Sequence, residues 1–72
     1  MKNGFSYAEF GRKMYDLRME RKLTLARLTD ELGCDACMAH NWESGKCAPR
    51  IHYLFAICKF YGVSADWLLG LK

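Results

Sequence analysis

The sequence predicts an all-α fold, in which residues 1–72 form a single compact domain of five helices. The first observation behind this prediction is that apolar residues recur at spacings of three and four, whereas no stretch alternates apolar and polar residues as a strand does. The second is that capping residues and glycines interrupt the pattern at short intervals, which indicates several short helices. A chain of this length buries one small core.

The first helix is expected over residues 7–21. Ser6 and Glu9 have the spacing of a capping box, and Phe5 and Phe10 have that of a hydrophobic staple. The apolar stripe that should face the core consists of Tyr7, Phe10, Met14 and Leu17.

Two short helices should follow, joined by a tight turn. Thr24 can cap the second helix, and Gly33 can end it in the left-handed conformation. Asp35 can then cap a third helix at once, and Ser44 and Gly45 mark its end. So short a connection makes the two helices cross steeply.

The last two helices are expected near the carboxyl end of the sequence. Pro49 fits the first turn of a fourth helix that runs to Tyr61, where Gly62 stops it. Ser64 can cap a final short helix over residues 65–69.

Charge and hydropathy narrow the class of protein. The net charge of +3 suits an acidic partner but does not identify one. The longest uninterrupted apolar run, residues 53–58, is far too short to span a membrane, so no membrane partner is expected. Residues 1–5 lack the features of a signal peptide, which predicts a cytoplasmic protein with reduced cysteines.

Neither enzyme activity nor metal binding is expected. The sequence has no paired carboxylates, no nucleophile with a base and no glycine-rich phosphate loop, so no cofactor or small-molecule substrate is predicted. Cys34 and Cys37 have a zinc-ligand spacing. In the helical interpretation, however, Cys34 and Cys58 are small buried apolar residues that share no tetrahedral site.

Residues 23–45, LTLARLTDELGCDACMAHNWESG, have the order of a helix-turn-helix unit. Leu17 and Arg18 precede this segment, and Lys46, Pro49 and the ending YGVSADWLLG follow it. Over about residues 8–70 the chain thereby resembles the lambda-repressor-like, Cro-type (XRE) family of regulators. The resemblance implies a homodimer that binds double-stranded DNA at a palindromic operator, with repression as the expected role, although activators and antitoxins share the fold.

The resemblance also implies which residues meet the bases. In that family the third helix, here residues 36–43, lies in the major groove. The positions that correspond to base-contacting residues are Ala36, Cys37, His40 and Asn41. Ala36 and Cys37 form hydrogen bonds weakly or not at all, which leaves His40 and Asn41 to read base edges, and an asparagine amide can pair with adenine.

The phosphate contacts implied by the resemblance fall on Thr24, Ser44 and Lys46, with Arg50 on the same side. Leu25 departs from the polar residue usual beside Thr24 and cannot donate a side-chain hydrogen bond. Cys37 and Cys47 should also lie near this surface, where oxidation could weaken binding, but nothing in the sequence indicates the lowered thiol pKa of a redox switch.

Arg18 and Glu43 match two charged positions that the family pairs across the first and third helices, an arrangement that would orient the recognition helix. The alternative is two separate solvated charges.

The fourth helix is predicted to carry a dimer contact. Its core-facing residues should be Leu54, Ile57, Cys58 and Tyr61, which leaves Tyr53 and Phe60 as an exposed aromatic pair. Together with the apolar ending at Trp67 and Leu68, this pair would form an interface patch. The alternative is that these side chains are buried within the chain.

A rival function is a helix-turn-helix fold used as a protein-interaction module, either antitoxin-like or regulator-binding. Leu25, Ala36 and Cys37 favour it because they read bases poorly. The polar residues clustered on one side argue for DNA, since a protein-binding surface does not require them: Asn41, Ser44, Lys46 and Arg50.

Overall fold

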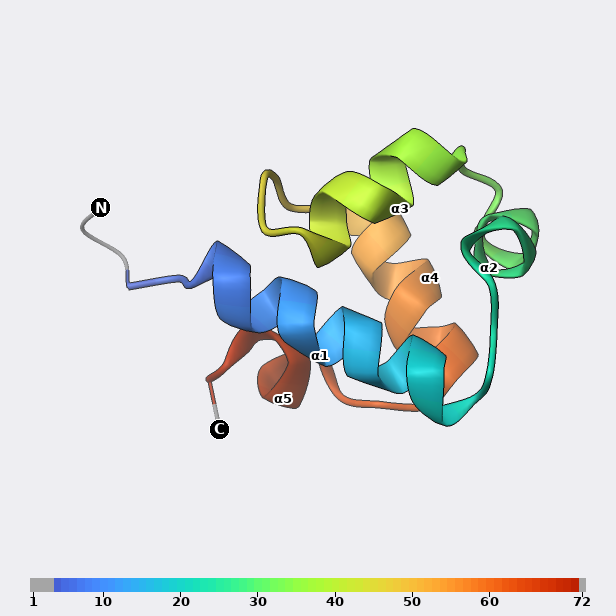
Figure 1. The fold of residues 1–72 in the computed structure, drawn as a ribbon. Helices are drawn as coiled ribbons and strands as arrows, with labels where there is room; N and C mark the ends of the chain where they lie inside the picture. Colours follow the sequence, from blue (N-terminus) through green and yellow to red (C-terminus); the bar gives the residue numbers. More distant parts are fainter. Residues whose placement is uncertain (1–3, 72) are drawn as a thin grey trace.

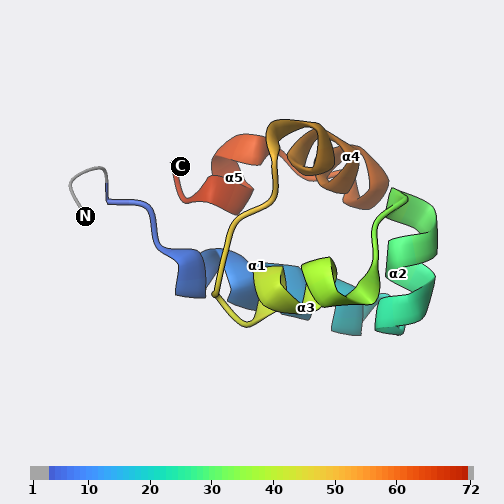
Figure 2. The same cartoon turned by 90° about the horizontal axis from the view of Figure 1, so that it is seen from above.

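The computed structural model describes residues 4–71. Within this range the chain forms five helices, which confirms the predicted all-α fold (Figure 1). In chain order they are α1 (Tyr7–Glu20), α2 (Leu25–Leu32), α3 (Ala36–Glu43), α4 (Ile51–Tyr61) and α5 (Ala65–Leu69). Seen from above in Figure 2, α1 and α3 lie on one side, α4 and α5 lie on the other, and α2 closes one end. None of the described helices is long and apolar enough to cross a membrane.

Side-chain caps fix where four of the helices begin. In each case an oxygen of the predicted capping residue accepts a hydrogen bond of 2.9–3.1 Å from a backbone N–H in the first turn, and these residues are Ser6, Thr24, Asp35 and Ser64. Gly33 and Gly62 end α2 and α4 with φ angles of 74° and 71°, a region that glycine enters without strain. Capping side chains and glycines thus determine most of the helix boundaries.

The fourth helix begins later than predicted. Pro49 was expected inside its first turn, but Arg50 has an extended backbone with ψ 161° and the first helical residue is Ile51. Proline fixes only its own φ and imposes no helical conformation on the residue that follows it. The preceding loop therefore continues through Arg50.

The core lies between the two sides of the molecule and draws on all five helices. Its buried apolar residues are Phe10, Met14, Leu17, Leu28, Leu32, Ala39, Trp42, Ile57, Tyr61 and Leu68. Trp42 contributes the largest of these side chains from α3 and is only 2% exposed. α3 is consequently anchored by one face, and its other face remains open to solvent.

Helices α1 and α3 touch through their backbones at Gly11. A Cβ atom placed on Gly11 would lie 2.5 Å from the carbonyl oxygen of Glu43 and 2.6 Å from that of Trp42. Real Cβ atoms do not approach backbone oxygens so closely. Gly11 therefore sets the distance between α1 and the end of α3.

Candidate nucleic-acid interface

The turn between α2 and α3 is closed by backbone hydrogen bonds. The N–H groups of Gly33 and Cys34 both donate to the carbonyl of Thr29, at 2.8 Å and 3.2 Å. Cys34 is half-buried and packs against the core, as predicted for the residue in the turn. This arrangement carries the chain directly from the end of α2 into α3.

All four predicted base-contacting residues lie on α3. Ala39 and Trp42 face the core, whereas Ala36, Cys37 and His40 are exposed and Asn41 is half-buried. Within residues 4–71 the side-chain amide of Asn41 has no hydrogen-bond partner, so its donor and acceptor are both available. α3 therefore offers a solvent-facing surface with two side chains able to bind a base edge.

The end of α3 is organised around the Asn41 carbonyl. This oxygen accepts hydrogen bonds from the backbone N–H of Lys46 at 3.0 Å and from the Ser44 hydroxyl at 3.3 Å. Both donor residues are exposed, and both were predicted to contact phosphate. The fold thus holds Ser44 and Lys46 beside the C-terminal end of α3.

The other two predicted phosphate contacts lie at the starts of helices. Thr24 and Arg50 are exposed and are the N-cap residues of α2 and α4. The first turn of α2 has no acidic side chain, so its N–H groups remain suited to an anion. Leu25 instead packs partly against the core, which explains an apolar residue there.

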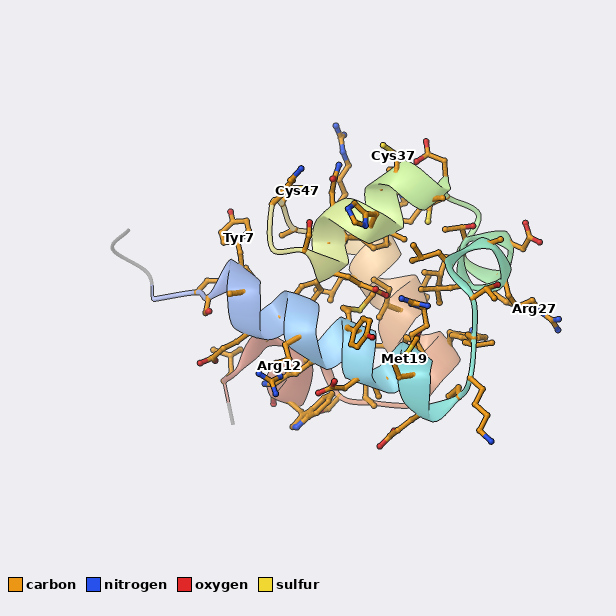
Figure 3. The ribbon with its side chains drawn as sticks, viewed as in Figure 1. Tyr7, Arg12, Met19, Arg27, Cys37 and Cys47 are labelled. Atoms are coloured by element: carbon orange, nitrogen blue, oxygen red, sulfur yellow. The ribbon has the colours of Figure 1, made fainter. Side chains whose placement is uncertain are left out.

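The two surface cysteines point away from the core, Cys37 from α3 and Cys47 from the loop that leads to α4 (Figure 3). Both are exposed free thiols. Cys34 and Cys58 are half-buried, and burial raises the pKa of each of these thiols. Among residues 4–71, no group of histidine, cysteine and acidic side chains is arranged to hold a metal ion.

Arg18 and Glu43 form a bidentate ion pair between α1 and the last residue of α3. Arg18 Nε donates to Glu43 Oε2 at 2.8 Å, and Arg18 Nη2 donates to Oε1 at 3.0 Å. The side chains are 11% and 7% exposed, so these are not separate solvated charges. The hydrogen bonds to Glu43 raise the pKa of Arg18, and Arg18 Nη1 also donates to the Leu23 carbonyl at 2.9 Å.

Tyr61 lies beside this pair and was not singled out from the sequence beyond its apolar character. Its hydroxyl oxygen is buried and has no hydrogen-bond partner within the described residues. Burial raises the pKa of Tyr61 to about 12, and the negative charge of Glu43 acts in the same direction. The hydroxyl is therefore neutral at physiological pH.

Replacing Tyr61 with phenylalanine should leave the free energy of unfolding at pH 7 unchanged or raise it by about 1 kcal/mol, because an unpaired buried hydroxyl is removed. In the wild type this hydroxyl ionises near pH 10 when unfolded and at about 12 when folded. Tyr61 therefore costs stability as the pH rises through that interval, and Tyr61→Phe should reduce the loss. Urea titrations of both proteins at pH 7 and across pH 10–12 provide the measurement. A loss above about 1 kcal/mol at pH 7 would mean that the hydroxyl is hydrogen-bonded.

The aromatic patch predicted for the dimer contact is largely covered within the chain. Tyr53 and Phe60 pack partly against the core, and the Tyr53 ring centroid lies 5.5 Å from that of Trp42. Leu68 is only 1% exposed and belongs to the core, whereas Trp67 remains 40% exposed. The helical pattern of α4 did not show which side its neighbours would cover.

The apolar surface of α4 lies instead at Ile51 and Phe55, which are 80% and 67% exposed. They border a groove of about 600 Å³ between α4 and the start of α5. Apart from Lys59 the groove is lined by uncharged residues, namely Ile51, Leu54, Phe55, Cys58, Val63 and Ala65.

Comparison with known proteins agrees with this geometry. The helix-turn-helix family model matches residues 14–68. The chain is 38% identical over 62 residues to the HTH-type transcriptional activator BcrR of Enterococcus faecalis, covering 86% of this chain and 30% of that protein. The chain thus spans less than a third of the length of that relative.

Solved structures show the same fold. The P22 c2 repressor in complex with synthetic operator 9T superimposes with a TM-score of 0.82 and 25% identity, over 88% of this chain and 96% of that one. The controller protein C.AhdI from Aeromonas hydrophila gives a TM-score of 0.77 with 18% identity, over 86% of this chain and 94% of that one.

The fold and the exposed face of α3 define a helix-turn-helix domain of the DNA-binding, regulatory class rather than an enzyme. The chain belongs to the helix-turn-helix family of the XRE and Cro type.

Proposed function

We propose that this domain binds double-stranded DNA sequence-specifically, with α3 in the major groove, and that it regulates transcription in this way. The observation that carries the proposal is the two-sided character of α3. One side is fixed by Trp42, Gly11 and the ion pair of Glu43, and the other presents His40 and Asn41 to solvent. A rigid helix with unpaired polar side chains is what direct base readout requires.

We assign two kinds of DNA contact to these side chains. His40 and Asn41 would meet base edges, with Ala36 and Cys37 packing in the groove near the start of the helix. The N-terminus of α2 at Thr24 would meet phosphate groups, and so would the three polar or basic residues that follow α3: Ser44, Lys46 and Arg50.

Asn41 and Lys46 should respond differently to mutation. Asn41→Ala should weaken binding to a selected operator by about 1–3 kcal/mol and leave random DNA almost unaffected, because a base contact is lost. Lys46→Ala should weaken both and lower the slope of log affinity against log salt by about one unit per half-site, because a phosphate contact is lost. The operator is first selected from random-sequence DNA, and both variants are then titrated with salt on operator and scrambled duplexes.

Arg27→Ala provides a charge-matched control for Lys46→Ala, because Arg27 is an exposed cation on α2 that already pairs with Glu31. Equal losses for Asn41→Ala on both duplexes would contradict base readout by α3. If neither Asn41→Ala nor Lys46→Ala affected DNA binding, the protein-interaction module would be the better interpretation.

We further propose that the domain acts as a homodimer on a palindromic operator, with the groove beside Phe55 occupied by a second copy of the chain. Phe55 lines the groove and is 67% exposed, so a two-fold contact would place the Phe55 ring of each copy against the groove of the other. Lys59 is its one charged lining residue, so repulsion between copies is small. A two-fold axis would also match the symmetry of a palindrome.

Phe55→Ser should convert the dimer to a monomer and weaken binding to a two-half-site operator, while binding to a single half-site stays the same. Sedimentation and titrations on both duplexes measure this. Trp67→Ser is the matched control, since Trp67 is an exposed aromatic residue outside the groove. A strictly monomeric wild type, both free and on DNA, would contradict the dimer.

Repression is the regulatory role that we propose for the domain, because occupation of an operator is sufficient for it. A domain of the same family also occurs in a protein named as an activator, so operator position and partner proteins would set the direction of regulation. A DNA-binding role agrees with the cytoplasmic location predicted from the sequence.

A further inference from the structure

A second pocket lies between α1 and the start of α5, apart from every residue assigned above to DNA. Its volume is about 530 Å³. Leu17 and Val63 supply apolar surface, and Trp67 adds a half-exposed aromatic ring. On the α1 side the pocket is bordered by Lys13, Asp16 and Glu20.

The aromatic part of this pocket already binds a cation from its own chain. Lys13 Nζ lies 5.0 Å from the centre of the Trp67 ring and donates a hydrogen bond of 2.6 Å to the Trp67 carbonyl. A cation over an aromatic ring and beside a carbonyl is favourably placed. The position of Lys13 therefore indicates that this part of the pocket accepts a positive charge.

Two carboxylates line the α1 side of the pocket. Asp16 and Glu20 are exposed, lie one helical turn apart on α1, and form no ion pair within residues 4–71. Lys13 is the one basic residue of the lining, and its charge is directed to Trp67. The lining thus carries two carboxylates and one lysine, a net charge of −1, on a chain whose net charge is +3.

We propose that this pocket binds a basic segment of a partner protein, with an arginine or lysine placed against Asp16, Glu20 and the Trp67 ring. The aliphatic part of such a side chain would lie on Leu17 and Val63, and its charged end would reach the carboxylates. Two acidic groups one turn apart suit a segment that lies along α1 better than they suit a free ion. Because the pocket contains none of the predicted DNA contacts, partner and DNA would bind together.

The test uses an acetylated, amidated peptide of eight residues with two arginines and two leucines. The control peptide has citrulline in place of arginine. NMR titration of the whole chain should show saturable shifts of the Trp67 indole N–H with the arginine peptide alone, and these shifts should weaken with salt. The indole of Trp42, which is 2% exposed, serves as the internal reference.

Matched variants complete the test. Asp16→Asn with Glu20→Gln should raise the Kd about fivefold to tenfold, as expected for two exposed ion pairs. Asp30→Asn with Glu31→Gln, which removes the same charge from α2, should leave the Kd unchanged. Lys13→Met should lower the Kd, because the resident cation no longer competes.

Equal shifts with the citrulline peptide, or equal losses in the two acidic double variants, would overturn the proposal. Binding of free argininamide as tight as that of the peptide would also overturn it, since a small-molecule site would then be the better description. DNA affinity should be the same for wild type and the Asp16→Asn, Glu20→Gln variant, so the result does not depend on the proposed DNA-binding function.

Discussion

Replacing Arg18 with alanine is expected to lower the free energy of unfolding by about 3–5 kcal/mol, the cost of leaving a buried charge without its partner. Glu43 is only 7% exposed at its side chain, and both of its oxygens accept hydrogen bonds from Arg18. The substitution would also leave the Leu23 carbonyl without the hydrogen bond from Arg18. A loss of this size is a large share of the stability of a small domain. Urea unfolding followed by circular dichroism measures it.

Arg27→Ala is the control, because Arg27 and Glu31 form an exposed pair at 3.7 Å that should contribute less than about 1 kcal/mol. Replacing both Arg18 and Glu43 with methionine should recover part of the loss, since no charge is then left unpaired. A loss below about 1 kcal/mol for Arg18→Ala would instead show that the ion pair is effectively solvated.

Gly11→Ala should destabilise the domain by about 1–3 kcal/mol, as overpacking does. In an ordinary helix the same change would stabilise by about 0.5–1 kcal/mol, so the expected sign is reversed. The reason is the position of the new Cβ, which would lie 2.5 Å from a backbone oxygen that has no side-chain freedom with which to move away. Since α3 would have to shift, operator affinity should fall as well. The free energy of unfolding and the operator affinity are both measured on the same variant.

Gly33→Ala separates packing from backbone strain. A Cβ at Gly33 meets open space, but the residue has φ 74°. The substitution should therefore lower the free energy of unfolding by about 1 kcal/mol through backbone strain alone. This variant should lose some stability yet keep its operator affinity after correction for the folded fraction. A Gly11→Ala protein as stable as the wild type would show that α1 and α3 can move apart freely.

Local signals were sufficient to predict the helices. A cap of Ser, Thr or Asp and a glycine after the last turn determine where a helix begins and ends, almost independently of tertiary structure. This is why Asp35 and Gly33 were placed correctly. Pro49 was misplaced because proline is equally suited to the residue before a cap and to the first turn.

The exposed side of α4 could not be predicted in the same way. Apolar residues occur almost all round this helix, so its periodicity does not define one buried face. Tertiary contacts determine which side is buried. Tyr53 packs on Trp42, whereas Phe55 stays 67% exposed and is approached from its own helix by Lys59 Nζ, 5.7 Å from the ring centre. Leu68 was misjudged for the same reason, since whether α5 folds back onto the core depends on the position of α1.

In the functional site, the resemblance to a family supplied residue positions but not their packing. The pairing of Arg18 with Glu43 was inferred from matching positions, and the structure provides its geometry and burial. The role of Gly11 could not be predicted from the sequence. A glycine inside a helix can be assigned to a close contact between helices only when the position of the neighbouring helix is known. The unpaired hydroxyl of Tyr61 likewise becomes visible only in three dimensions.

The position of α1 also has a consequence for how the protein is made. The polar contacts of α1 and of its C-cap residue, Arg21, reach far along the chain. Arg18 meets a residue 25 positions later, Arg21 donates to a carbonyl 40 positions later, and Lys13 donates to one 54 positions later. During translation α1 therefore emerges before these partners, and its contacts are complete only after α5 has been made. At about 5–20 residues per second, the chain spends several seconds with these contacts of α1 incomplete. The complete core, which includes Leu68 of α5, cannot form until nearly the whole domain has been translated.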